Sequence, residues 1–199
     1  IDDTLYARWH DRLAMTEAEL TAHLHALYPE RRQTEPRFWH DERFICPTKP
    51  VVGVCWHEAQ AYCAWLSAQS GVTFRLPTAT EWEAAARGQS ARVYAFGDAF
   101  DAMKANTHET CVKRPAPVGV FPQGDTPEGV SDMSGNAFEW SSSLVSIHND
   151  GPEAGHPDRP DDGREALGED LASGIDVRGG AWDWAHSHAH SASRDGFEH

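Results

Sequence analysis

Apolar residues in the first half of the chain recur at every third or fourth position, the spacing of one helix face. The first such run follows Thr16-Glu17-Ala18-Glu19, whose hydroxyl and carboxylate are placed to form a capping box. Three leucines then share one face: Leu20, Leu24 and Leu27. The pattern predicts a helix over about residues 17 to 28, ended by Pro29.

A second apolar segment begins with Val51-Val52-Gly53-Val54, which has the composition of a short buried strand. It runs into a predicted helix from about residue 57 to 69, stopped by Gly71. The expected buried stripe of this helix consists of Ala59, Cys63 and Leu66. The tryptophans expected in the core are Trp56, Trp65, Trp82, Trp140 and Trp182.

A second capping box, Thr78-Ala79-Thr80-Glu81, predicts a short helix that ends before Gly88. Beyond about residue 90 no segment keeps a helical period for three turns. We therefore expect short strands joined by long, locally ordered loops in this half. Residues 148–170 are the most polar stretch and are expected to form an exposed excursion.

The net charge of the chain and the length of its apolar runs restrict the kinds of partner that it can bind. Aspartate and glutamate outnumber lysine and arginine 31 to 17, which gives a formal charge of −14, so nucleic acid and anionic lipid are poor partners. No apolar run approaches the ~20 residues of a membrane helix, and no signal-peptide pattern opens the chain, so neither a membrane partner nor a compartment is indicated. The 199 residues suit one domain.

Four cysteines lack the CxxC spacing of a metal or redox motif: Cys46, Cys55, Cys63 and Cys111. Cys55 and Cys63 lie among apolar residues at nearly helical spacing. We expect buried free thiols.

Five ordered phrases within residues 36–194 closely resemble the formylglycine-generating enzyme (sulfatase-modifying factor) family. They are Pro50-Val51-Val52-Gly53-Val54-Cys55-Trp56, Ala61-Tyr62-Cys63-Ala64-Trp65-Leu66, the stretch from Phe74 to Gly88, Asp132-Met133-Ser134-Gly135-Asn136-Ala137-Phe138-Glu139-Trp140, and Arg178-Gly179-Gly180. The resemblance implies an α+β, C-type-lectin-like fold with two main helices, small twisted antiparallel sheets and much irregular loop structure. Family members usually carry further strands at both ends, so residues 1–199 are expected to be a single such domain, incomplete at both ends.

The resemblance also implies a departure from the family's chemistry. In its aerobic enzymes, two cysteines after the Arg-Gly-Gly phrase bind copper and attack the substrate, and the matching positions here are Trp184 and Ala189. Neither supplies a thiolate, so no copper and no formylglycine-generating activity are expected. The His-x-x-x-His-x-Glu phrase of related iron-dependent sulfoxide synthases does not occur either.

A calcium loop is a further implication of the resemblance. Its candidate ligands are the carbonyls of Asp132, Gly135 and Ala137 and the carboxylate of Glu139. Such hard oxygen donors suit calcium. The alternative is a simple turn in which Glu139 binds nearby backbone amides.

A second family calcium site matches only in part. Asn106 and Thr107 are its candidate ligands, but the Asp-rich stretch that would complete it before Pro115 is missing.

His186, His188 and His190 alternate, so on a strand they would face one side at about 7 Å spacing. Three imidazoles in such a row cannot easily converge on one zinc ion, which favours an exposed contact face over a metal site. Trp184 lies two residues before His186, so on a regular strand it would face the same side as the histidines. Either a core or a surface role is open for it.

We expect a non-catalytic, ligand-binding protein resembling the variable proteins of diversity-generating retroelements, with residues 178–199 as the variable region. Adenine-directed mutation of asparagine-type codons yields Asp, Ala, His and Ser, the residues found at Asp183 and at 185–193. A protein or other macromolecular partner would contact residues 182–195. The candidate contact residues are Asp183, Trp184, His186, His188, His190 and Ser193. The alternatives are a family oxidoreductase with altered chemistry, and a sensor or accessory domain of a larger protein.

Overall fold

The computed structural model describes residues 16, 18–19, 22, 35–146 and 173–197. Its contacts divide the chain into two units, residues 1–36 and 37–199. In the first unit, Ala18, Glu19 and Ala22 are helical. The Thr16 amide donates to the Glu19 carboxylate at 2.9 Å, and the Glu19 amide donates to the Thr16 hydroxyl at 3.4 Å, as the capping box predicts. The leucines of that predicted helix and the polar excursion at 148–170 lie outside the described residues.

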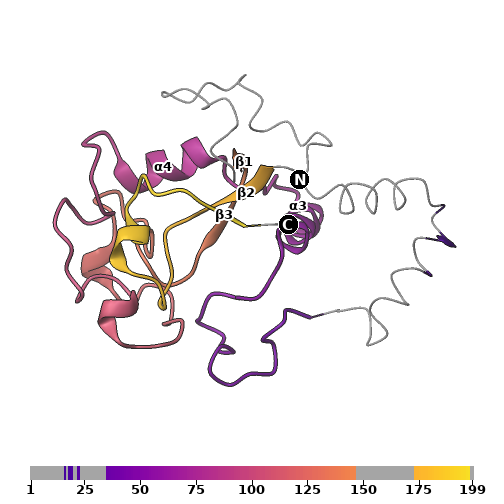
Figure 1. Ribbon diagram of the computed structural model, residues 1–199. Helices are drawn as coiled ribbons and strands as arrows, with labels where there is room; N and C mark the ends of the chain where they lie inside the picture. Colours follow the sequence, from indigo (N-terminus) through magenta and orange to yellow (C-terminus); the bar gives the residue numbers. More distant parts are fainter. Residues whose placement is uncertain (1–15, 17, 20–21, 23–34, 147–172, 198–199) are drawn as a thin grey trace, which may run out of the picture. The chain divides into compact units, whose positions relative to one another are not determined.

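Helix α3 (Trp56–Ser70) begins the secondary structure of the second unit (Figure 1). The Cys55 amide donates to the Glu58 carboxylate at its start, and Gly71 ends it in the left-handed conformation, with φ of 70°. Only Trp56 is buried. The predicted stripe is half-buried, and Trp65, expected in the core, is 55 % exposed.

The predicted strand over residues 51–54 is wrong. Gly53 adopts a positive φ of 75°, and a Cβ there would lie 2.7 Å from the Phe38 ring. This left-handed residue breaks the extended run, and its carbonyl accepts a hydrogen bond from the Arg37 amide at 3.1 Å. The segment is therefore an irregular connection whose close packing against Phe38 requires glycine.

Helix α4 (Ala79–Arg87) confirms the second capping box. The Glu81 amide donates to the Thr78 hydroxyl at 3.1 Å, and the Thr78 amide donates to the Glu81 carboxylate at 2.9 Å. Gly88 ends the helix, whose buried positions are Ala79, Trp82 and Ala86. Trp82 and Ala86 form a core cluster with Ala95 and Met133.

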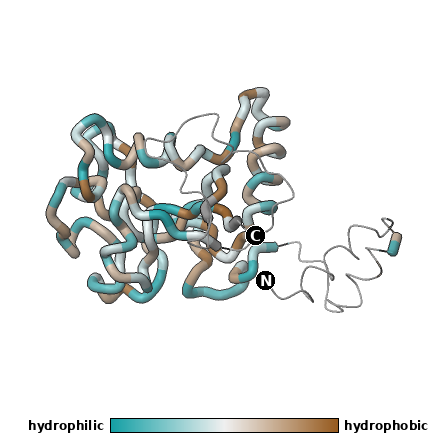
Figure 2. Tube along the Cα trace, turned by 45° about the horizontal axis from the view of Figure 1, so that its top comes forward, coloured by the Kyte–Doolittle hydropathy of each residue, from teal (hydrophilic) through white to brown (hydrophobic). Residues whose placement is uncertain are grey.

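One antiparallel sheet has the order β1-β2-β3, with β1 (Glu139–Ser146), β2 (Ser173–Arg178) and β3 (Asp195–Phe197). Trp140 pairs with Val177 and Asp176 pairs with Gly196. The described part of this unit also contains long irregular segments and three 3-10 turns: η1 (His108–Thr110), η2 (Pro122–Gly124) and η3 (His186–Ala189). Hydrophobic and hydrophilic positions alternate over short stretches of this irregular chain (Figure 2). The expected α+β class is confirmed, and no helix among the described residues is long and apolar enough to cross a bilayer.

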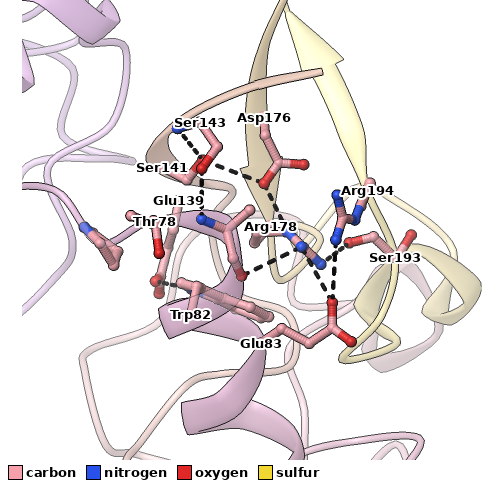
Figure 3. A network of polar contacts seen from close by, with 12 residues as sticks. Thr78, Trp82, Glu83, Glu139, Ser141, Ser143, Asp176, Arg178, Ser193 and Arg194 are labelled. Carbon is pink, nitrogen blue, oxygen red and sulfur yellow. Dashed lines mark hydrogen bonds and ion pairs between the residues drawn. The ribbon is translucent and has the colours of Figure 1, made fainter. Parts of the chain in front are cut away.

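The guanidinium of Arg178, at the end of β2, is fully buried. Its Nε donates to Asp176 at 2.7 Å, Nη1 donates to the Ser193 carbonyl at 3.0 Å, and Nη2 donates to the Ala79 carbonyl at 3.4 Å (Figure 3). Nη2 also lies 3.3 Å from the Glu83 carboxylate. One side chain therefore joins β2, α4 and the segment before β3.

We predict that Arg178→Met lowers the free energy of unfolding by about 3–5 kcal/mol, because it leaves the Asp176 carboxylate buried without its cation. Arg75→Met is the matched control, since it removes an ion pair with Glu81 whose side chains are 61 % and 49 % exposed. Its cost should stay below about 1 kcal/mol. Urea unfolding measures both, and equal costs for the two variants would contradict the prediction.

Candidate functional site

Two glycines turn the chain after β2. Gly179 and Gly180 have positive φ values of 88° and 74°. A Cβ on Gly180 would lie 3.0 Å from the backbone of His188 and Ala189, so residues 186–189 fold back against this turn. The Gly179 carbonyl accepts a hydrogen bond from the Gly135 amide at 2.6 Å, which ties the turn to the loop before β1.

Residues 186–189 form the 3-10 turn η3, so the three histidines do not alternate along a strand and do not share one exposed face. The Glu109 carboxylate accepts the His186 amide at 3.1 and 3.2 Å, and the His188 amide donates to the Ala185 carbonyl at 3.0 Å. Ala189 is fully buried, and its carbonyl accepts the Ser134 hydroxyl. Long-range contacts to Glu109 and Ser134 therefore set this backbone.

His186 and His190 both face Tyr94, a buried residue that sequence reasoning missed. The Tyr94 hydroxyl lies 2.7 Å from His186 Nδ1 and 2.9 Å from His190 Nε2. Burial raises the pKa of Tyr94 and lowers the pKa of His190. Nothing in the spacing of residues 186–190 points to a partner some ninety positions earlier.

Trp184 and His188 lie on the outer side of the same segment. The Trp184 ring is 36 % exposed and meets the His188 ring edge-on at 4.6 Å and the Phe138 ring edge-on at 5.2 Å. His188 Nδ1 lies 3.1 Å from the Asp195 carboxylate, a partner that sequence reasoning also missed. Trp184 is therefore a surface residue held in place by two aromatic neighbours.

The remaining predicted contact residues divide by exposure. Asp183 is exposed and Ser193 is half-buried, with its amide donating to the His190 carbonyl at 2.9 Å. Trp182, expected in the core, is half-buried and contacts Phe44 at 5.8 Å between ring centroids. Among the predicted contact residues, Asp183 and Trp184 are thus exposed, and the half-buried His188 packs against Trp184; we call these three residues the outer face.

All four cysteines are free, as expected, but none is buried. Cys46 and Cys63 are half-buried, whereas Cys55 and Cys111 are exposed. Cys55 precedes the first turn of α3 and Cys111 occupies a left-handed loop position, and neither place belongs to the core.

Glu139 and Asp132 are the two carboxylates of the predicted calcium loop. Glu139 accepts the Trp82 indole N–H at 2.7 Å rather than backbone amides, and burial raises its pKa to about 7, with the Asp132 charge adding to the effect. Burial likewise raises the pKa of Asp132, which accepts the Gly119 amide at 2.8 Å. In the described part of the chain neither has a lysine or arginine partner, so a hard cation would supply missing charge.

The backbone carbonyls of the predicted calcium loop are less suited to bind a cation than its two carboxylates. The Gly135 carbonyl accepts the Ala137 amide at 3.1 Å, which uses one of its lone pairs. Within the described ranges no three His, Cys, Asp or Glu side chains are grouped as a metal site.

Asn106 and Thr107, the second predicted calcium pair, are buried beside the same loop. The Asn106 carbonyl accepts the Asn136 amide at 2.7 Å, and a Cβ on Gly135 would lie 2.5 Å from that carbonyl. The Asn106 side-chain oxygen is buried and has no hydrogen-bond partner. Thr107 instead donates its hydroxyl to Glu109 at 2.7 Å.

Comparison with curated proteins finds relatives that share only part of their length with this chain. A hercynine oxygenase of Mycolicibacterium thermoresistibile is 38 % identical over 123 residues, which cover 55 % of this chain and 26 % of the oxygenase. The formylglycine-generating enzyme of Bos taurus is 31 % identical over 135 residues, covering 61 % of this chain and 34 % of the enzyme. The chain thus spans about a quarter to a third of these relatives.

Solved structures give the same fold. PvdO from Pseudomonas aeruginosa aligns with a TM-score of 0.61 at 26 % identity, covering 90 % of this chain and 70 % of that one. Treponema denticola variable protein 1 aligns with a TM-score of 0.60 at 20 % identity, covering 90 % and 75 %. The family described as the sulfatase-modifying factor enzyme 1-like domain matches residues 4–199. The chain therefore belongs to the sulfatase-modifying factor enzyme 1-like family.

Proposed function

We propose that this chain is a non-catalytic ligand-binding domain that contacts a protein partner through residues 182–195. The observation that carries the proposal is the outer face, whose side chains project from a backbone fixed by contacts elsewhere. An exposed tryptophan held between two rings offers a large contact area at small entropic cost. Because the backbone is preformed, binding does not require the conformational entropy cost of ordering this loop.

The absence of thiolates supports a non-catalytic role. By resemblance, Trp184 and Ala189 stand at the positions of the family's copper-binding cysteines. Trp184 points outward and Ala189 is fully buried. This pair cannot bind Cu(I) as thiolates do, because indole and methyl groups are not soft ligands.

The fold and the residue composition support a diversified surface. Treponema denticola variable protein 1 shares this fold. Residues 185–193 contain only Ala, His and Ser, which adenine-directed mutation of asparagine-type codons produces. Side-chain exchange at exposed positions would then change the ligand without rebuilding the backbone.

A second candidate is an accessory domain of a larger enzyme. The match to hercynine oxygenases favours it, since the chain corresponds to about a quarter of their length. In that case the outer face would contact another domain of the same protein, and its sequence would be constant.

We also propose that calcium binds beside Glu139 and Asp132 and stabilises the loop before β1. Glu139, Asp132 and the unpaired Asn106 oxygen are the oxygen donors that fit this role best. A cation bound only by the native state would raise its stability by mass action and take no part in chemistry.

Deep sequencing of the encoding gene across many cells of one culture tests the binding proposal. We expect substitutions to cluster between residues 182 and 195, with Arg178-Gly179-Gly180 unchanged, because the buried polar network needs Arg178 and the left-handed turn needs both glycines. The gene segment encoding α4 is the internal control. A segment as constant as α4 would contradict diversification and favour the accessory-domain candidate.

Thermal unfolding of Glu139→Gln tests the calcium proposal. Because the folded pKa of about 7 exceeds the ordinary 4.5, native stability should fall as pH rises from about 4.5 to 7, by no more than about 3 kcal/mol. Without calcium, Glu139→Gln should therefore melt above the wild type at pH 8 and close to it at pH 4.5. Calcium at pH 8 should stabilise the wild type but not this variant.

Glu128→Gln is the control for calcium, because Glu128 is an exposed carboxylate that pairs with Arg92 at 2.9 Å. It should keep the full calcium response of the wild type. A wild type whose melting temperature is the same in calcium and in chelator would overturn the proposal.

A further inference from the structure

Tyr94 places its phenol oxygen between two imidazole nitrogens. The oxygen lies 2.7 Å from His186 Nδ1 and 2.9 Å from His190 Nε2. A hydroxyl carries one proton, so it can donate to only one of these nitrogens, and the other must donate its own N–H. Without the phenol proton, and with both nitrogens unprotonated, three lone pairs would point into one small volume.

The two distances are ordinary hydrogen-bond lengths, and they also fit one metal geometry better than another. Two ligand atoms about 2.0 Å from an ion lie about 2.8 Å apart at a right angle, and about 3.3 Å apart at the tetrahedral angle of zinc. The separations of 2.7 and 2.9 Å match the right angle.

The ring positions give an independent measure. The centroids of His186 and His190 are 6.3 Å apart. Imidazoles bound on opposite sides of one ion would have centroids about 6.3 Å apart, and adjacent ones about 4.4 Å. The two rings therefore have the spacing of opposite ligands, with the phenol oxygen between them.

We propose that Tyr94, His186 and His190 form a tetragonal copper(II) site with two opposite imidazoles and one phenolate. Square-planar or tetragonal N,O sites suit Cu(II), which also binds more tightly than Ni(II) or Zn(II) to a given set of such donors. His186 and His190 are partly exposed, so water can fill the fourth position. The expectation that the chain binds no copper rests on the missing thiolates, and this site uses none. The site also does not use the calcium loop, and it does not depend on the proposed ligand of the outer face.

The surroundings hold the three rings in place. Phe100 stacks on His186 at 4.4 Å and Phe96 stacks on Tyr94 at 5.4 Å. Glu109 fixes the His186 amide and adds negative charge nearby. Copper must displace the phenol proton of Tyr94, because only the phenolate is a ligand of the proposed site. Copper affinity should therefore rise with pH.

Copper(II) titration of the untagged full chain against a competing chelator tests the site. We expect one tight equivalent, an electron paramagnetic resonance spectrum of a tetragonal ion with two nitrogen ligands, and a visible phenolate-to-copper charge-transfer band. His186→Gln and His190→Gln should each weaken binding at least tenfold. Tyr94→Phe should remove the band and weaken binding.

His188→Gln is the matched control, since His188 lies in the same turn, is partly exposed and faces Asp195 instead. It should bind copper within twofold of the wild type. The chain has twelve histidines, so adventitious copper binding is the competing outcome. Equal losses in His188→Gln and His190→Gln, a single nitrogen ligand, or no charge-transfer band in the wild type would each overturn the proposal.

The wild-type spectra decide the matter even where a variant fails to fold. Melting curves without copper identify such a variant. Displacement of copper by an equal concentration of zinc would contradict the tetragonal geometry.

Discussion

A buried guanidinium has to satisfy its hydrogen-bonding groups within the protein, because an unpaired charge in the interior is costly. Arg178 does so with partners from three places: Asp176 in β2, Ala79 and Glu83 in α4, and Ser193 before β3. Each contact fixes one element relative to the others (Figure 3). In a unit with a three-stranded sheet and long irregular segments, this network supplies order that regular pairing does not.

The outer face follows from this anchoring. The segment that carries it leaves Arg178 through two left-handed glycines. It returns to Arg178 at Ser193, whose carbonyl accepts a hydrogen bond from Nη1 of Arg178. Between these ends, Ala189 and Ser191 are buried and the Ser191 amide donates to the Val93 carbonyl at 2.7 Å. The exposed residues between the anchors contribute little to the core, which is the property that a variable binding surface needs.

Sequence reasoning succeeded where local interactions determine the structure. The capping boxes of Thr16 and Thr78 form as predicted, because their donors and acceptors lie three residues apart. It failed at residues 51–54, where Gly53 packs against Phe38 in a left-handed conformation. A run of valines gives no sign of that conformation.

Prediction of the site failed for a similar reason. Alternating histidines favour a strand, but Glu109 and Gly180 impose a 3-10 turn in which His186 and His190 face Tyr94 while His188 faces Asp195. Trp65 is also exposed, and Trp56 is the one buried residue of α3. Long-range contacts of this kind leave no periodic signal in a single sequence.

The outer face can vary only if the backbone of residues 182–195 is held independently of it. Amide hydrogen exchange of the triple variant Asp183→Ala, Trp184→Ala, His188→Ala tests this independence most directly. The amides of residues 188, 191 and 193 donate to backbone carbonyls in the structure. We predict that their protection stays within a few-fold of the wild type, as does that of the β2 amides. Loss of protection at 188, 191 and 193 with β2 unchanged would show that the outer face itself holds the segment, and would contradict the account.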